Sequence, residues 1–220
     1  MRIVFSRELE RLDLDVVRMG ALAEASIDAA LLAMAEGDSE RARRVMQSDD
    51  EIDSLFLDIE KRAMALLAQQ QPVARDLRLV IAILKVTNDL ERCGDLASNI
   101  AAEVIDDINV PRPKALTTAV YELGGSARRL LGRSLDAWSN KDLELAASLD
   151  RLDDEIDDQY DGLFKALFGL EEEISIELAM HLVLVGRFFE RIADHAVNIA
   201  EAILYYVTGE LEHPEEAPAE

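Results

Sequence analysis

Hydrophobic residues recur along this chain with the three-to-four-residue spacing of amphipathic helices. Val45, Ile52 and Phe56, for example, fall at steps that place them on one helix face. Glycine, asparagine and proline interrupt the pattern between the periodic segments, most strongly at 109–113, where two of the five prolines lie. The pattern predicts six long helices, at residues 6–36, 39–70, 74–108, 114–138, 141–168 and 172–208.

The second half of the chain repeats the first. ERCGDLASNIA at 91–101 and ERIADHAVNIA at 190–200 match at 7 of 11 positions, 99 residues apart, and DDEID occurs at both 49–53 and 153–157, 104 residues apart. Two matching blocks in the same order indicate a duplicated three-helix unit. Short connections make neighbouring helices antiparallel, so we expect an all-α fold of two tandem three-helix bundles. They span 1–109 and 110–208, followed by an acidic disordered tail at 209–220.

Composition and charge narrow the possible functions. Half of the 220 residues are hydrophobic, only 5% are aromatic, and the formal net charge is −22. That charge repels phosphate backbones and anionic lipid surfaces, so a nucleic-acid partner is not expected. The longest uncharged run, 63–74, is too short to cross a membrane, and the N-terminus lacks the apolar stretch of a signal peptide. The single cysteine, Cys93, fits a reducing compartment. We expect a soluble, cytoplasmic protein without membrane insertion.

The acidic residues are arranged at matching levels along the predicted helices. In an antiparallel hairpin, residues equidistant from the turn lie side by side. The second and third helices turn near Gln71-Pro72, and residue 71 is the midpoint of Glu51 and Glu91. The DDEID block should therefore lie level with the ERCGD block. The same arithmetic brings Glu24 and Asp28 of the first helix to this level.

Several of these acids also face the same way. Asp49 occupies a position where the helical pattern calls for an apolar residue, and so does Asp153 in the second half. Burying several carboxylates together costs several kcal/mol per uncompensated charge, which a bound cation would offset. An all-oxygen ligand set suits hard ions such as Mg²⁺, Mn²⁺ or Fe³⁺. Two further pairs lie on single helix faces at i and i+4, namely Glu91/Asp95 and Glu190/Asp194.

The acidic residues are open to three further interpretations. The carboxylates could lie on solvated helix faces of a metal-free scaffold, or Arg92 and Arg191 could neutralise Asp95 and Asp194 at i+3. A third possibility is a di-iron carboxylate enzyme, but that chemistry usually takes a Glu-x-x-His from each of two helices. The six predicted helices contain no such motif. The chain also lacks a Gly-rich phosphate loop, a nucleophile elbow and a CxxC pair.

Two segments resemble a known family. Residues 72–103, PVARDLRLVIAILKVTNDLERCGDLASNIAAE, closely resemble the third helix of PhoU proteins, and 186–201, GRFFERIADHAVNIAE, resemble its second copy. The resemblance covers about residues 5–208 and implies two bundles related by pseudo-twofold symmetry. It also implies clusters of Fe, Mn, Mg or Zn held by E(D)xxxD motifs. The matching positions are Asp49, Asp53, Glu91 and Asp95 in the first unit and Asp153, Asp157, Glu190 and Asp194 in the second, with Glu24, Asp28, Asp50 and Asp154 as weaker candidates.

The resemblance further implies a role without catalysis. Such a protein is an accessory regulator that bridges the ATPase subunit of the phosphate ABC transporter and a membrane sensor histidine kinase. When phosphate is plentiful, it holds the kinase in its inhibited or phosphatase-favouring state. It would thus be a negative regulator of the phosphate-starvation response and a modulator of phosphate uptake, and a homodimer is expected.

Overall fold

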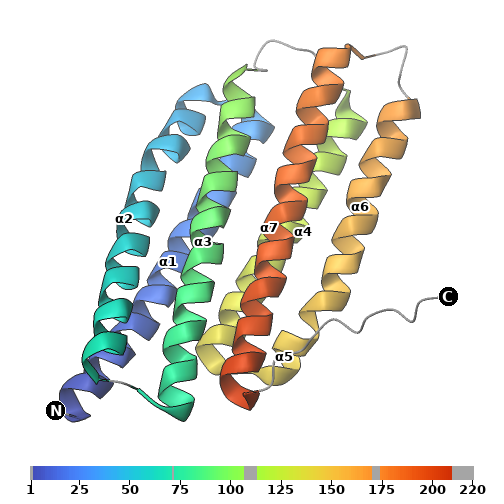
Figure 1. The fold of residues 1–220 in the computed structure, drawn as a ribbon. Coiled ribbons are helices and arrows are strands. Elements are labelled where there is room, and N and C mark those ends of the chain that lie inside the picture. Colours follow the sequence, from blue (N-terminus) through green and yellow to red (C-terminus); the bar gives the residue numbers. More distant parts are fainter. Residues whose placement is uncertain (1, 71, 107–112, 170–173, 210–220) are drawn as a thin grey trace.

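The chain folds into α-helices joined by short turns (Figure 1). The structure is a computed structural model, and it describes residues 2–70, 72–106, 113–169 and 174–209. These residues contain no strand. Their helices are α1 (Arg2–Glu36), α2 (Ser39–Gln70), α3 (Ala74–Asp106), α4 (Lys114–Asn140), α5 (Leu143–Ala147), α6 (Leu149–Gly169) and α7 (Ile176–Thr208).

The predicted fifth helix is divided, which corrects the expectation of a continuous 141–168 segment. Ser148 interrupts it between α5 and α6. The Ser148 backbone N–H donates to the carbonyl oxygen of Leu145 at 3.0 Å, three residues back rather than four, and the Ser148 hydroxyl donates to the same oxygen at 2.7 Å. A serine side chain that bonds to a nearby backbone carbonyl competes with the helical pattern, which explains the break.

The helices form the two predicted antiparallel bundles, so the all-α expectation is confirmed. Helices α1, α2 and α3 pack together in the first unit, and α4, α6 and α7 pack together in the second. The units are joined through corresponding helices, α3 against α7 and α1 against α4 (Figure 1). The buried apolar residues of both units form one continuous core. The boundary predicted at 109/110 lies outside the described residues, as does 210–220 of the predicted tail.

The contact between α1 and α4 displays the pseudo-twofold symmetry directly. A Cβ atom on Gly20 would lie 2.4 Å from Cδ2 of Leu135, and a Cβ on Gly124 would lie 2.6 Å from Cδ2 of Leu31. Gly124 and Leu135 follow Gly20 and Leu31 by 104 residues, the offset of the repeated DDEID block. Each glycine thus admits the leucine of the other unit, and the contact is made twice.

No helix in the described part of the chain is both long enough and apolar enough to span a membrane.

Candidate functional site

The two acidic blocks of the first unit meet where α2 faces α3. Asp53 of α2 and Glu91 and Asp95 of α3 each offer a carboxylate oxygen that lies within 4.8 Å of the other two. Gly94 permits this approach, because a Cβ there would lie 2.7 Å from Oδ1 of Asp49 and 3.0 Å from Ile52. The DDEID and ERCGD blocks therefore lie level with each other in the first unit, as the sequence predicts. We call the group formed by Asp49, Asp53, Glu91 and Asp95 the first acidic cluster.

Buried oxygens in the first acidic cluster lack hydrogen-bond partners. Oδ1 of Asp49 and Oε2 of Glu91 are inaccessible to solvent and make no hydrogen bond. Burial raises the pKa of Asp49; the nearby Ser98 side chain lowers it, and the charges of Asp53 and Asp95 raise it. Burial likewise raises the pKa of Glu91, and repulsion from Asp95 raises it further. Carboxylates in this state gain most from a cation placed among them.

One arginine partly neutralises this cluster. Nη1 of Arg92 donates to Oδ2 of Asp95 at 3.0 Å, and Nε lies 3.5 Å from Oε2 of Glu91. The Arg92 side chain is half exposed, and its single charge faces four carboxylates. The orphaned oxygens and the converging donors therefore fit a hard metal ion, which would be held by Asp53, Glu91 and Asp95. An oxygen set of this kind suits Mg, Mn or Fe better than Zn, which favours nitrogen and sulfur ligands.

The second unit carries a matching group, the second acidic cluster, made by Asp153 and Asp157 of α6 and Glu190 and Asp194 of α7. Oδ1 of Asp153 and Oε2 of Glu190 are buried without hydrogen-bond partners. Burial raises the pKa of Glu190, and repulsion from Asp194 raises it further. In the described residues, however, no three oxygens of this group come as close together as those of the first cluster. A metal at this second cluster stays a prediction.

The weaker candidates lie elsewhere. Glu24 and Asp28 meet Arg128 of α4: Nη1 of Arg128 lies 3.2 Å from Oε1 of Glu24, while its Nε and Nη2 donate to the Asp28 carboxylate at 3.0 and 3.1 Å. Their face of α1 turns toward the second unit. The expectation that Glu24 and Asp28 complete the first acidic cluster is therefore wrong. Asp50 and Asp154 are exposed next to the clusters and are not among the converging residues.

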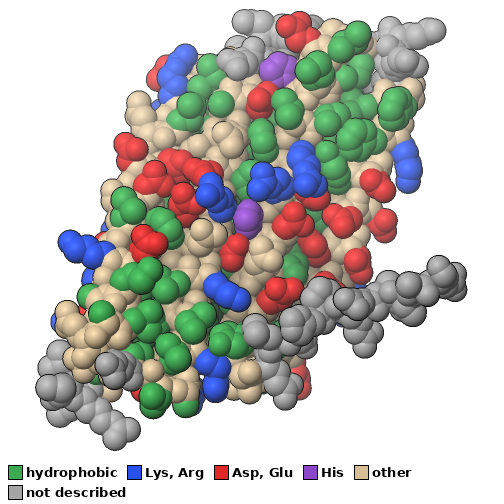
Figure 2. Space-filling model, viewed as in Figure 1, with side chains coloured by type: hydrophobic (Ala, Val, Ile, Leu, Met, Phe, Trp, Pro, Cys, Tyr) green, Lys and Arg blue, Asp and Glu red, His purple; other side chains and the backbone are tan. Residues whose placement is uncertain are grey.

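Sequence reasoning missed Arg187, which donates a hydrogen bond to Oε1 of Glu190. Arg187 precedes Glu190 by three residues on α7, a spacing that brings two helical side chains together. The signal was therefore present in the sequence. Figure 2 shows acidic side chains gathered at two places on this face, over α2–α3 and over α6–α7, with basic residues beside both. Each cluster thus has its own arginine, and each keeps an excess of carboxylates.

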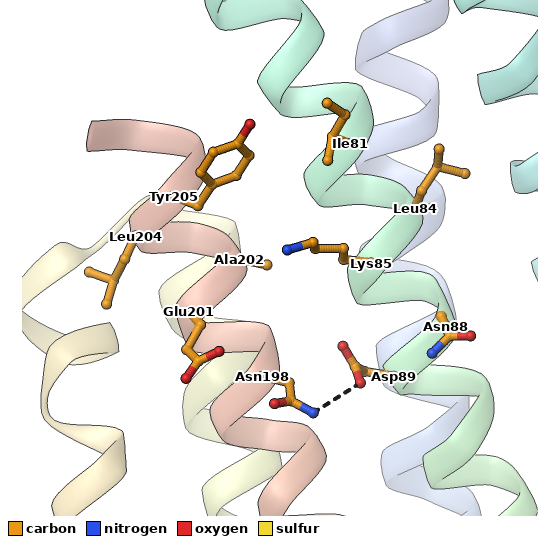
Figure 3. Close-up of a pocket in the computed structure, with 10 residues that line it drawn as sticks. All are labelled: Ile81, Leu84, Lys85, Asn88, Asp89, Asn198, Glu201, Ala202, Leu204 and Tyr205. Atoms are coloured by element: carbon orange, nitrogen blue, oxygen red, sulfur yellow. Dashed lines mark hydrogen bonds between the residues drawn. The ribbon is translucent and has the colours of Figure 1, made fainter. Parts of the chain in front are cut away.

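Sequence reasoning also missed Asp89, a buried acid between α3 and α7. Oδ1 of Asp89 lies 2.9 Å from Nδ1 of His195 and accepts a hydrogen bond from Asn198 at 3.3 Å (Figure 3). Asp89 is only 8% exposed. The signal was again an acid on an apolar face, since Val86 and Cys93 at i−3 and i+4 are fully buried.

Asp89 lines a hollow of about 500 Å³ in the groove between α3 and α7 (Figure 3). Two alanines, Ala82 and Ala202, stand on the two helices at this level. The residues 99 positions away are His181 and Glu103, and those two side chains bond to each other across the other half of the same groove. The pseudo-symmetric half of the groove thus holds a hydrogen-bonded His–Glu pair where this half has two alanines.

We expect Asp153→Asn to stabilise the metal-free protein at pH 8 but much less at pH 4. Burial, then repulsion from Asp157 and Asp194, raises the pKa of Asp153 to about 7, against about 3.9 in an unfolded chain. Because the folded protein holds this proton more tightly, the contribution of Asp153 to the free energy of unfolding is highest below pH 4 and falls as the pH rises to 7. This difference in pKa corresponds to at most about 4 kcal/mol of stability. Solvent screening of the partly exposed Asp153 side chain reduces the stabilisation expected from Asp153→Asn to about 1–2 kcal/mol.

Urea unfolding in the presence of a chelator at both pH values measures this difference. Asp154→Asn is the control, because Asp154 is the exposed neighbour of Asp153. Its effect should differ much less between pH 4 and pH 8 than the effect of Asp153→Asn, because Asp154 enters only through its repulsion of Asp157. Equal effects of the two substitutions at both pH values would contradict the assignment of a raised pKa to Asp153.

Comparison with known proteins places the chain in a family. A family model described as the PhoU domain matches residues 16–104 and 120–203, one match in each unit. A phosphate-specific transport system accessory protein PhoU homolog from Caulobacter vibrioides is 36% identical over 208 residues, covering 94% of this chain and 90% of the relative. A phosphate-specific transport system accessory protein PhoU homolog 1 from Thermotoga maritima is 34% identical, covering 93% of this chain and 89% of the relative.

Solved structures agree with these sequence matches. The crystal structure of PhoU from Pseudomonas aeruginosa aligns with a TM-score of 0.88 at 34% identity, covering 94% of this chain and 100% of that one. The phosphate transport system regulatory protein PhoU from Streptococcus pneumoniae aligns with a TM-score of 0.86 at 30% identity, covering 96% and 100%. The resemblance found in the third helix of each unit is confirmed over nearly the full chain, and this protein belongs to the PhoU family.

Proposed function

We propose that this protein is a cytoplasmic negative regulator of the phosphate-starvation response and a modulator of phosphate uptake. It would act as an adaptor between the ATPase subunit of the phosphate ABC transporter and a sensor histidine kinase. The observation that carries the proposal is the family membership, since relatives at 31–36% identity are named accessory proteins of the phosphate-specific transport system. One structural neighbour is titled a phosphate transport system regulatory protein. These names describe accessory and regulatory proteins, not enzymes.

The architecture suits a protein that works by contact. Six long helices share one core, so the two acidic clusters are held on a stiff frame and present a fixed pattern of charge on one face (Figure 2). A metal bound by Asp53, Glu91 and Asp95 would neutralise part of that charge and fix the orientation of the three side chains. We propose that the metal shapes a docking surface rather than a reaction centre, and that the protein is a homodimer.

Deletion of the gene tests the regulatory role. Without the regulator, the kinase should stay active at high phosphate, so we expect a phosphate-starvation reporter to rise at least tenfold in phosphate-rich medium. Wild-type protein supplied in trans should restore repression. A reporter that stays repressed in the deletion strain at high phosphate, as in the parent, would count against the proposal.

A metal-free scaffold is the second candidate. It is favoured by the ion pairs Arg92–Asp95 and Arg187–Glu190, in which the protein supplies its own cations. In that case purified protein would contain no stoichiometric metal, and the acidic clusters would bind basic groups of a partner directly.

A further inference from the structure

Large apolar side chains are exposed where α6 ends and α7 begins. Phe168 is 74% exposed, Ile176 81% and Met180 60%. With Phe164, Val183 and Leu184 they line a hollow of about 470 Å³, which we call the α6–α7 apolar groove. The hydrophobic side chains at the upper right of Figure 2 lie over these helix ends. Contiguous apolar patches on a protein surface mark interaction sites, because leaving them in water is unfavourable.

The first unit serves as an internal control for this groove. Residues 104 positions before α6 and 99 positions before α7 occupy the corresponding places on α2 and α3. There, Glu60 stands in place of Phe164 and Lys85 in place of Leu184. Charges thus interrupt the apolar surface of the first unit, where α2 likewise packs against α3. The bundle does not need an uninterrupted groove in order to fold, so the groove in the second unit requires another reason.

The groove continues into the second acidic cluster. Asp157 precedes Phe164 by seven residues on α6, and Glu190 follows Val183 by seven on α7. Seven residues are two helical turns, so in each case the acid lies on the same face as the apolar residue, about 10 Å along the helix. The composition of helix α6 changes along its length, with acids in its first two thirds and the sequence GLFKALFG, apolar except for Lys165, at its end. The strip between α6 and α7 is therefore apolar at one end and acidic at the other.

We propose that this strip binds an amphipathic helix of a partner protein, with bulky apolar residues at one end and Lys or Arg about two turns further on. The apolar residues would enter the α6–α7 apolar groove, and the basic residues would face the second acidic cluster. Charge argues against an acidic helix such as α6 of a second copy as the occupant, because its acids would meet the second acidic cluster with the same sign. The homodimer proposed above would form on another surface. The inference goes beyond the proposed function, because it holds whichever protein supplies the helix.

Two synthetic helical peptides test the proposal against the full-length protein by fluorescence anisotropy. Both carry three Leu or Phe residues at helical spacing, and two turns later one carries three Arg and the other three Glu. The groove variant is Phe168→Ser/Ile176→Ser, at two highly exposed positions whose replacement leaves the core intact. The control is Met64→Ser/Leu77→Ser, the corresponding exposed pair of the first unit.

We expect the wild type to bind the Arg peptide at least tenfold more tightly than the Glu peptide. The groove variant should lose at least tenfold in affinity for the Arg peptide, and the control variant should stay within twofold of the wild type. Equal binding of the two peptides, or equal losses in the two variants, would overturn the proposal. So would sedimentation velocity that shows a wild-type dimer and a monomeric groove variant, because the groove would then hold a second copy. The reporter assay fails or succeeds independently of these results.

Discussion

Glu91→Gln/Asp95→Asn is expected to remove the metal from purified protein. The two substitutions keep the size of the side chains but take away two of the three converging carboxylates of the first acidic cluster. Losses of 10–100-fold in metal affinity are typical when only a residue supporting a ligand is changed, so the loss of two ligands should exceed about 100-fold. Elemental analysis of tag-free wild type and variant measures the effect and identifies the ion.

The matching control is Glu190→Gln/Asp194→Asn, the same change at the pseudo-equivalent positions. If the first acidic cluster is the stronger site, this control keeps stoichiometric metal. Thermal melting gives a second readout, since a ligand at 100 times its Kd stabilises by about 2.7 kcal/mol. Added metal should raise the melting temperature of the wild type and of the control but not that of Glu91→Gln/Asp95→Asn. Absence of metal from every protein would contradict the prediction and favour the scaffold held by Arg92 and Arg187.

The first acidic cluster shows how far sequence reasoning can go within a hairpin. The short separation between the end of α2 at Gln70 and the start of α3 at Ala74 determines which residues of the two helices are level. The apolar repeat determines which face is inward, so the approach of Asp53 to Glu91 and Asp95 could be predicted. Both facts are local, because one short turn connects the two helices.

The misplaced residues depend on contacts that no turn fixes. The sequence predicts Glu24 at the level of a third acidic element, but α1 packs against α4 as well as α2 and α3, and Glu24 contacts Arg128 of α4. The Asp89–His195 pair likewise forms across the contact between α3 and α7, and its two residues are 106 positions apart. Level and periodicity say nothing about which distant helix a polar face meets.

Phe189→Ala is expected to cause the largest loss of stability, because Phe189 lies where the two units join. Its ring is fully buried. A Cβ on Gly124 of α4 would lie 2.6 Å from Cζ of this ring and 2.6 Å from Cδ2 of Leu31 of α1. Removing a buried Phe side chain costs about 3–5 kcal/mol when the cavity cannot collapse. Urea unfolding measures the loss, and Phe188→Ala, at the partly buried neighbour, should cost clearly less.

A double-mutant cycle tests whether the close approach of α4 at Gly124 is coupled to the Phe189 ring of α7. Gly124→Ala alone forces a methyl group against the Phe189 ring and Leu31, at a cost of about 1–3 kcal/mol. In the Phe189→Ala background the ring is gone, so the same methyl group meets Leu31 only and partly fills the cavity. The double variant should therefore be more stable than the sum of the single effects, by about 1 kcal/mol or more. Additive effects would mean that the close approach at Gly124 is not coupled to the Phe189 ring. Since Phe189 directly precedes Glu190, coupling at this ring would link the packing of α4 against α7 to the position of the second acidic cluster.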